Sequence, residues 1–206
     1  WGGSVALSHA PVDDYTLDVM AASLNYHNRI ELSVARQTLD LDTLGAALNQ
    51  DDLQQDIFSA KIRLYGDVLY NRFGQWSLGI QHKRNRTFDV PSAVGAKDDS
   101  GTDVYLAGSK VFLSALFDRN ILVNGLVRGT KANQGGLLGF GGDRNNSYEA
   151  VFEGSAGLFF NRSWLAGVEY RQKPDNLGFA EEDDWYDVFV AWVPSRRLSV
   201  TAAWVN

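Results

Sequence analysis

Residues 56–67 read DIFSAKIRLYGD, and every second side chain in the middle of this segment is apolar. The apolar and polar positions alternate as follows: Phe58, Ala60, Ile62 and Leu64 against Ser59, Lys61, Arg63 and Tyr65. Because successive side chains of a β-strand point to opposite faces, this segment predicts one apolar face and one cationic face. A soluble sheet would turn the apolar face inward. A membrane-spanning barrel would turn it to lipid and would place Lys61 and Arg63 in a polar lumen.

The composition limits the classes of protein to which the chain can belong. Its 206 residues suit a single domain over 1–206. The chain has 20 Gly but only 4 Pro, which favours many strands joined by tight turns. With no Cys, it has neither a disulfide framework nor a thiolate metal site. The net charge of −6 argues against nucleic acid as a partner, since nucleic acid requires a basic face.

No segment approaches the roughly 18 consecutive apolar residues of a membrane-spanning helix. The longest apolar run, VFLSALF at 111–117, is short and contains Ser114. Since only helices and closed barrels span a bilayer, a membrane protein with this sequence has to be a barrel. The first ten residues, WGGSVALSHA, lack the basic and apolar regions of a signal peptide, so we expect no signal peptide within the chain.

Short turns with a basic residue recur along the chain and predict a series of β-hairpins. They are HNR at 27–29, NRFG at 71–74, DRN at 118–120, NRS at 161–163 and SRR at 195–197. Alternating segments beside these turns predict about ten strands: 16–26, 30–39, 56–66, 75–84, 102–115, 121–131, 147–160, 164–172, 185–193 and 198–205, with 4–10 as part of another. The other connections are longer and rich in Gly, Asn and Asp. This asymmetry predicts an antiparallel up-and-down transmembrane β-barrel, with short turns at one end and long loops at the other.

Large aromatic rings lie near the ends of the predicted apolar faces. Trp164 and Tyr170 bracket one strand, and Tyr186 and Trp192 bracket the next. Amphipathic rings favour the two membrane interfaces, about 25 Å apart on a barrel wall. A soluble core would instead hold its largest rings in the middle of the strands. The aromatic pattern therefore favours a lipid-facing wall, and a soluble β-barrel is the alternative fold.

Polar and charged side chains occupy the opposite face of the predicted strands. The predicted pore-lining residues are Lys61, Arg63, Lys83, Glu149, Glu153, Glu169 and Arg171. Both signs of charge occur, and cross-strand pairs of acid and base satisfy one another in a confined interior. A lumen with mixed charge predicts weak ion selectivity.

Several segments resemble the DUF3034 family of uncharacterised proteins from Gram-negative bacteria. The most distinctive are the loops: GAKDDSGTDVY at 95–105, KANQGGLLGFGGDRN at 131–145 and EYRQKPDNLGFAEEDDWYDVF at 169–189. RIELSVARQ at 29–37 and QDIFSAKIRLYGD at 55–67 match earlier strands of that family. The resemblance implies an exported β-barrel of the bacterial outer membrane, in contact with its lipid and lipopolysaccharide, and no established activity or catalytic residue. Members of the family usually begin earlier and continue past the last strand, so we expect about twelve strands in the complete protein.

The sequence contains no recognisable catalytic, metal or cofactor motif. His9, His27 and His82 lie in unrelated places without metal-ligand spacing, and His82 is on the apolar face. GFGGD at 139–143 lacks the Lys-Ser/Thr ending of a phosphate-binding loop. The acidic run EEDD at 181–184 lacks the spacing of a calcium loop. We therefore expect neither enzymatic activity nor a bound metal or cofactor.

The near-repeat of LLGFGGD and NLGFAEED predicts that two external loops pack together. The predicted loop contacts are Leu138, Phe140, Leu177 and Phe179. Such an apolar cluster would either constrict the mouth of the barrel or bind a partner protein. The sequence leaves both open.

Two functions fit these patterns. The first is a narrow channel or passive transporter for small polar solutes, because about twelve strands leave a lumen partly filled by side chains. The second is a non-conducting barrel scaffold whose long external loops bind a partner or stabilise the envelope.

Overall fold

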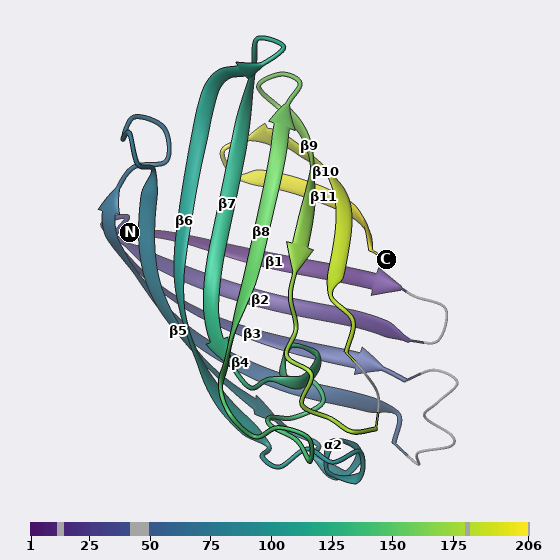
Figure 1. The fold of residues 1–206 in the computed structure, drawn as a ribbon. Helices are drawn as coiled ribbons and strands as arrows, with labels where there is room; N and C mark the ends of the chain where they lie inside the picture. The colour runs from purple at the N-terminus through teal and green to yellow at the C-terminus, as the bar shows by residue number, and fades with distance from the viewer. Residues whose placement is uncertain (12–14, 42–49, 180–181, 206) are drawn as a thin grey trace.

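The computed structural model describes residues 1–11, 15–41, 50–179 and 182–205, and it is dominated by one antiparallel sheet (Figure 1). The strands are β1 (Gly2–Pro11), β2 (Thr16–Tyr26), β3 (Ile30–Asp40), β4 (Asp52–Gly66), β5 (Gln75–Asn85), β6 (Ser100–Leu116), β7 (Arg119–Thr130), β8 (Glu149–Phe159), β9 (Trp164–Arg171), β10 (Trp185–Ser195) and β11 (Leu198–Val205). Each strand pairs with its neighbours in chain order. The ten predicted strands are confirmed, and residues 4–10 belong to an eleventh, β1.

The sheet curls so that β1–β4 and β6–β9 face each other across an interior (Figure 1). This is the up-and-down, barrel-like arrangement that the sequence predicts. β1 and β11 are the two edges of the sheet, and they do not pair with each other within the described residues. The expectation of about twelve strands in the complete protein stays a prediction.

The short connections lie at one end of the sheet and carry the irregularities of the strands. His27 and Asn28 both have positive φ, as the tight turn between β2 and β3 requires. Register shifts occur beside three other short connections, at Arg63/Tyr65, Phe112/Leu116 and Trp192/Ser195. Such bulges increase the local twist and help to curl the sheet.

The long connections lie at the other end. The β5–β6 loop contains a short helix that the sequence analysis did not predict, α2 (Asp89–Ala93). The plug loop, defined as residues 131–148 between β7 and β8, contains a 3-10 turn, η1 (Asn133–Gly136). In the described part of the chain, no helix has the length and hydropathy needed to cross a membrane.

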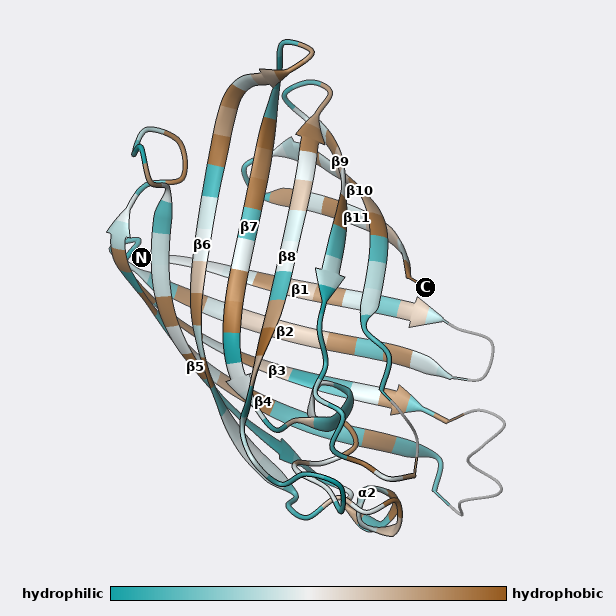
Figure 2. Ribbon diagram, in the orientation of Figure 1, coloured by the Kyte–Doolittle hydropathy of each residue, from teal (hydrophilic) through white to brown (hydrophobic). Residues whose placement is uncertain are grey.

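Apolar and polar residues alternate along the strands (Figure 2), and the strand residues with large, exposed apolar side chains lie on the outer face of the sheet. Val168 and Val188 pair across β9 and β10, and their side chains are 55% and 54% exposed. On the inner face, Lys83 and Asp103 are buried. This distribution is the inverse of a soluble barrel, and it fits a wall that faces lipid.

Candidate functional site

A ladder of charged side chains crosses the inner face from β5 to β9. We call it the inner charge ladder, and it consists of Lys83, Asp103, Arg128, Glu153, Glu169 and Arg171. The antiparallel register brings one or two of these residues from each strand to the inner face. Three of the side chains are cationic and three are anionic, so the ladder has no net charge.

The ladder begins with a buried ion pair. Lys83 Nζ on β5 lies 2.8 Å from Asp103 Oδ2 on β6, and both side chains are almost fully buried. On β7, Arg128 donates from Nη1 to the same Asp103 oxygen at 3.4 Å and from Nε to Glu153 Oε1 at 2.7 Å. Buried charges are tolerated when they are paired in this way. One arginine therefore joins the carboxylates of β6 and β8.

The ladder ends on β9, where Arg171 neighbours two carboxylates. Its Nε lies 3.6 Å from Glu153 Oε2 on β8, and its Nη2 donates to Glu169 Oε1 at 3.1 Å. The guanidinium also lies over the ring of Trp185 on β10, 5.7 Å from its centroid. The side chains of this end are more exposed than those of Lys83 and Asp103.

The structure places the predicted pore-lining residues in three settings. Lys83, Glu153, Glu169 and Arg171 lie in the ladder. Lys61 pairs separately with Glu31 on β3, at 2.7 Å from Oε1, and half-buried Arg63 lies toward the short-turn end of β4. Glu149 is at the opposite end of the inner face, exposed on the rim, where it accepts a hydrogen bond from Asn145.

The central members of the ladder, Asp103 and Arg128, were missing from the predicted set. Asp103 follows Ser-Gly-Thr, a sequence typical of a turn, and Arg128 precedes Gly129 near a predicted strand end. The alternation of side chains along these two strands nevertheless indicates that both residues point inward. Val104 and Val127 are outward and exposed, so their neighbours Asp103 and Arg128 have to point inward.

The plug loop folds back over the ladder. Lys83 Nζ donates to the carbonyl of Gly135 at 2.9 Å, and Asn85 Nδ2 donates to the carbonyl of Leu137 at 3.0 Å. Gly135 and Gly136 have positive φ, which permits the sharp turn. The tip of the loop is thus fixed to two inward side chains of β5.

Phe140 anchors the other side of the plug loop. Its side chain is 0% exposed and covers Gly101 on β6, where a Cβ added to the glycine would lie only 2.3 Å from Phe140 Cδ1. The backbone of Phe140 also bridges to Asp98 and Ala132. Only glycine at 101 leaves space for this ring.

The loop between β9 and β10 is hydrogen-bonded to the plug loop, mainly through Asn176. The Asn176 side chain is fully buried and donates from Nδ2 to Asn133 Oδ1 at 2.9 Å. Its backbone carbonyl accepts from the amides of Arg144 and Asn145 at 3.1 and 3.3 Å. The amide of Gly178 donates to Asp143 Oδ1 at 2.7 Å. The two loops are therefore joined by polar contacts at several points.

The predicted apolar contacts between these loops are found only in part. Phe140 and Leu177 are buried, at 0% and 3% exposure, and Leu177 lies beside Gly142 of the plug loop. Leu138 packs instead against the cluster of Leu41, Leu53 and Val90. Phe179 is 77% exposed and takes no part in the buried contact. Hydrogen bonds, several of them to Asn176, therefore join the loops alongside the apolar contact of Leu177.

Glu182, in the same β9–β10 loop, fixes the tip of the plug loop. Its two carboxylate oxygens accept from the amide of Gln134 at 2.9 and 3.2 Å. Burial raises the pKa of Glu182 to about 7, against the opposing effects of the Gln134 amide and nearby Lys173. Burial also lowers the pKa of Lys173, whose Nζ donates to Gln134 Oε1 at 3.2 Å. A titratable carboxyl therefore lies directly at the plug.

A polar cavity of about 300 Å³ lies between the plug loop and the inner wall. Its lining includes Gln37, Gln81, Lys83, Arg128, Glu153 and Arg171. The side chains offer hydrogen-bond donors and acceptors of both charges. The space suits water or a small polar solute.

The whole chain, residues 1–206, matches the model of a family described as proteins of unknown function, DUF3034. The chain belongs to the DUF3034 family. No match was found among curated proteins or among solved structures.

The histidines of this DUF3034 chain lie far apart in the fold. His9 Nδ1 lies 2.7 Å from Asp18 Oδ1. His82 contacts Thr102 on the outer face, as its place among the apolar residues of its strand predicts. His27 lies in a short turn, against the ring of Tyr26. Within the described ranges, no group of three or more His, Cys, Asp or Glu side chains is arranged to hold a metal ion.

Proposed function

We propose that this DUF3034 protein is an integral β-barrel of the bacterial outer membrane that passes small polar solutes through a narrow lumen. The observation that carries the proposal is the inner charge ladder beneath the plug loop, around a polar cavity of about 300 Å³. The apolar outer face supports the membrane placement. We propose no catalytic role, metal or cofactor.

The charges of the ladder support a passage with little preference for either sign of ion. Each of the three cationic and three anionic side chains lies within ion-pair distance of at least one side chain of opposite charge, so neither sign dominates the ladder. Liquid water occupies about 30 Å³ per molecule, so the cavity corresponds to about ten waters. The proposed solutes are therefore small and neutral or zwitterionic.

The plug loop supports a gated rather than a permanently open passage. It is held to β5 by Lys83 and Asn85, and to the β9–β10 loop by Asn176. Both sets of contacts would have to break before the loop could leave the mouth. We propose that transport requires this release.

A non-conducting scaffold is the second candidate, and one observation favours it. Asn133 and Phe140 of the plug loop are 0% exposed, as is Asn176 of the β9–β10 loop. A plug loop packed this closely is also what a permanently closed barrel would contain. In that case the outer loops would serve a partner or the envelope.

Conductance in a planar bilayer separates the two candidates. The refolded full-length protein should show small openings, and deletion of residues 132–141 should increase their size and frequency. Changing Lys61 and Arg63 together to Glu should shift the ion selectivity toward cations. Changing Arg196 and Arg197, which lie in an exposed short turn, should leave the selectivity unchanged. A barrel that inserts but never conducts, even without its plug loop, would replace the channel with the scaffold.

A further inference from the structure

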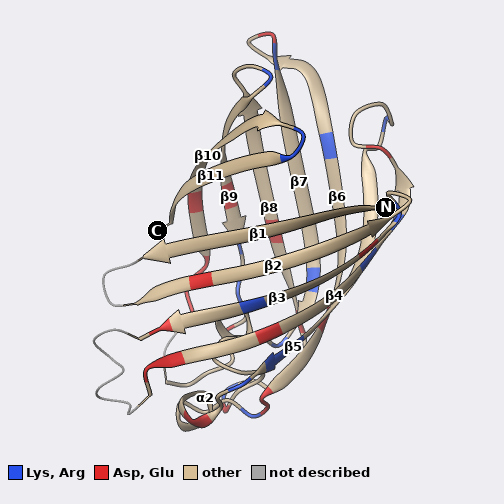
Figure 3. Cartoon of the chain, turned by 180° about the vertical axis from the view of Figure 1, so that it is seen from behind, with Lys and Arg blue, Asp and Glu red and all other residues tan. Residues whose placement is uncertain are grey.

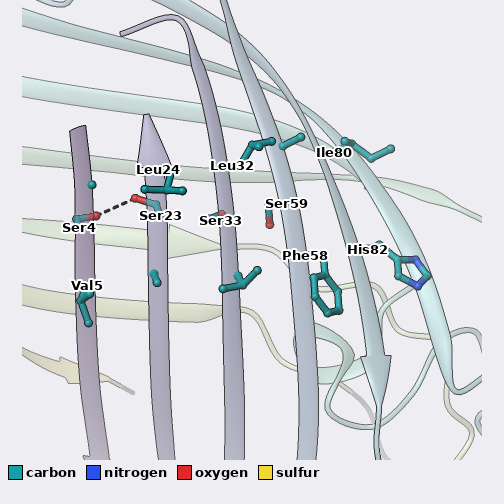
Figure 4. A pocket seen from close by; sticks show the side chains of 14 residues that line it. Ser4, Val5, Ser23, Leu24, Leu32, Ser33, Phe58, Ser59, Ile80 and His82 are labelled. Carbon is teal, nitrogen blue, oxygen red and sulfur yellow. Dashed lines mark hydrogen bonds between the residues drawn. The ribbon is translucent and has the colours of Figure 1, made fainter. Parts of the chain in front are cut away.

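The outer face of β1–β5 carries an apolar groove of about 850 Å³ (Figure 4). Small residues hollow the wall at Gly3, Ala22 and Ala60, while larger apolar side chains rise beside them. Leu24, Leu32 and Ile80 lie in one row across the strands, and Val5 and Phe58 lie in the next row. The groove has the dimensions and lining suited to acyl chains.

A row of charges borders this groove on the side of the long loops. One row lies across Val34, Phe58 and His82. Two residues along each strand toward the long loops, the next outward row is Arg36, Asp56 and Arg84. These side chains share the outer face because residues two apart in a strand point the same way. Figure 3 shows these bands of alternating charge on β3–β5, next to an acidic band on β2 that is Asp18.

The charges at this border are not balanced. Arg36 donates to Asp56 at 2.8 Å, and Arg86 lies 3.5 Å from the other oxygen of the same carboxylate. Arg84 lies directly opposite Asp56 in the register, and its side chain has no ion pair among the described residues. Arg36 and Arg86 thus share the Asp56 carboxylate, and Arg84 adds a third cationic side chain at this border. These four residues carry two net positive charges, and the neighbouring Asp18 pairs with His9. We call this set the outer arginine cluster: Arg36, Arg84 and Arg86, with Asp56.

The height of the cluster on the wall corresponds to the external membrane interface. Arg36 lies six residues beyond Ile30 at the short-turn end of β3, about 20 Å along the strand. On the other side of the barrel, Tyr170 lies six residues beyond Trp164 on β9. Tyr170 and its neighbour Tyr186 have ring centroids 5.1 Å apart, as expected of an interfacial aromatic girdle. The arginines therefore lie where lipid headgroups begin, next to a groove that crosses β1–β5 on the side of the bilayer centre.

We propose that the groove and the outer arginine cluster together bind a phosphorylated, multiply acylated glycolipid of the outer leaflet, with the chemistry of lipid A. Guanidinium groups form paired hydrogen bonds with phosphate oxygens, and several of them together can bind the oxygens of a phosphorylated headgroup. The excess of two positive charges matches a lipid that carries two phosphates. The acyl chains would lie against the small residues of the groove. This inference rests on the proposed outer-membrane placement.

Native mass spectrometry of the full chain in a non-ionic detergent tests the proposal with bisphosphorylated lipid A as the probe. Wild-type protein should retain lipid A, and the triple variant Arg36→Gln, Arg84→Gln, Arg86→Gln should bind it at least tenfold more weakly. The matched control is Arg162→Gln, Arg196→Gln, Arg197→Gln, which removes three exposed arginines from the short-turn end. This control should bind lipid A as wild type does.

A second variant tests the groove without touching the cluster. Ala60→Phe fills the hollow and should also weaken binding about tenfold, whereas Ala156→Phe, on the outer face of β8, should not. Equal retention of lipid A by wild type and the triple variant would overturn the proposal. So would equal binding of phosphate-free lipid A or of phosphatidylglycerol, or a protein dimer that Ala60→Phe dissociates.

Insertion into vesicles of neutral phosphatidylcholine separates this proposal from the membrane placement. A wild-type chain that neither inserts nor becomes protected from protease would remove the placement itself. A chain that inserts normally but shows no preference for lipid A would overturn only the lipid site.

Discussion

Arg128 and Glu153 are joined on the inner face by a hydrogen bond of 2.7 Å between Nε and Oε1. Their side chains are only 14% and 16% exposed, and the same guanidinium reaches Asp103 on the other side. The centroid of the Tyr105 ring on β6 lies 5.2 Å from the Cζ atom of Arg128. Side chains of β6 and β8 therefore enclose the guanidinium. This single side chain connects the two halves of the ladder.

Replacing Arg128 with Leu should destabilise the barrel by about 3 kcal/mol, since removing one partner leaves buried carboxylates uncompensated. Urea unfolding in detergent, followed by tryptophan fluorescence, measures this change. The double variant with Glu153→Leu should recover part of the loss. Arg144→Leu removes the exposed pair with Asp175 and should cost less than about 1 kcal/mol. Equal losses in Arg128→Leu and Arg144→Leu would contradict the structural role of the ladder.

Asn176 should determine how firmly the plug loop is held. Replacing it with Ala removes the hydrogen bonds to Asn133 and to the carbonyl of Lys131, and leaves buried polar partners unsatisfied. The expected cost is about 1–3 kcal/mol, confined to the loops. Hydrogen exchange of the amides of residues 133–141 should become faster, while exchange in β5–β8 should not change.

Phe179→Ala is the matched control for Asn176→Ala, because it alters the same loop at an exposed position. It should leave exchange in the plug loop at the wild-type rate. If the phenylalanine variant releases the loop and the asparagine variant does not, the loops are joined by apolar contacts after all.

Glu182 should make docking of the plug loop dependent on pH. Its pKa is about 7 in the docked state against an ordinary 4.5, because burial disfavours the charged carboxylate. The docked loop therefore holds the proton more tightly than a released loop. The stabilisation is fully present below pH 4.5 and is lost as the pH rises through about 7. Plug amides should consequently be better protected at about pH 5.5 than at about pH 8, after correction for intrinsic exchange rates.

Glu182→Gln should remove this pH dependence. Its amide oxygen can still accept from Gln134, but it carries no titratable charge. Glu149→Gln changes an exposed carboxyl on the rim and should preserve the pH dependence. A slope that persists in Glu182→Gln would assign the titration to a different group, such as Lys173 near the same carboxyl.

The strands were predictable from the sequence because local alternation determines them. DIFSAKIRLYGD shows both faces of β4 directly, and exposed Phe58 and half-buried Lys61 lie on the expected sides. The ladder was only half predictable, because a pairing such as Arg128 with Asp103 depends on register across strands. The plug loop was the hardest part. Its fixation by Asn176 and Lys83 joins residues that are far apart in the chain, and no local period encodes that contact.

The outer face gives the sharpest test of the proposed membrane placement. Val168 is exposed in the middle of β9, with Val188 directly opposite on β10. An arginine at the bilayer centre costs roughly 2–4 kcal/mol on the lipid face of a barrel. Val168→Arg should therefore lower the free energy of unfolding in phosphatidylcholine vesicles by that amount.

Ser33→Arg is the matched control for Val168→Arg, because it introduces the same side chain on the inner face of β3. Ser33 lies opposite two other small residues, Ser23 and Ser59, so the lumen has space for a longer side chain. The Ser33 variant should unfold within about 1 kcal/mol of wild type, since its charge stays in polar surroundings. If Val168→Arg were tolerated as well as Ser33→Arg in vesicles, the outer face would not be in lipid. The inverted wall would then need another explanation, such as burial against protein.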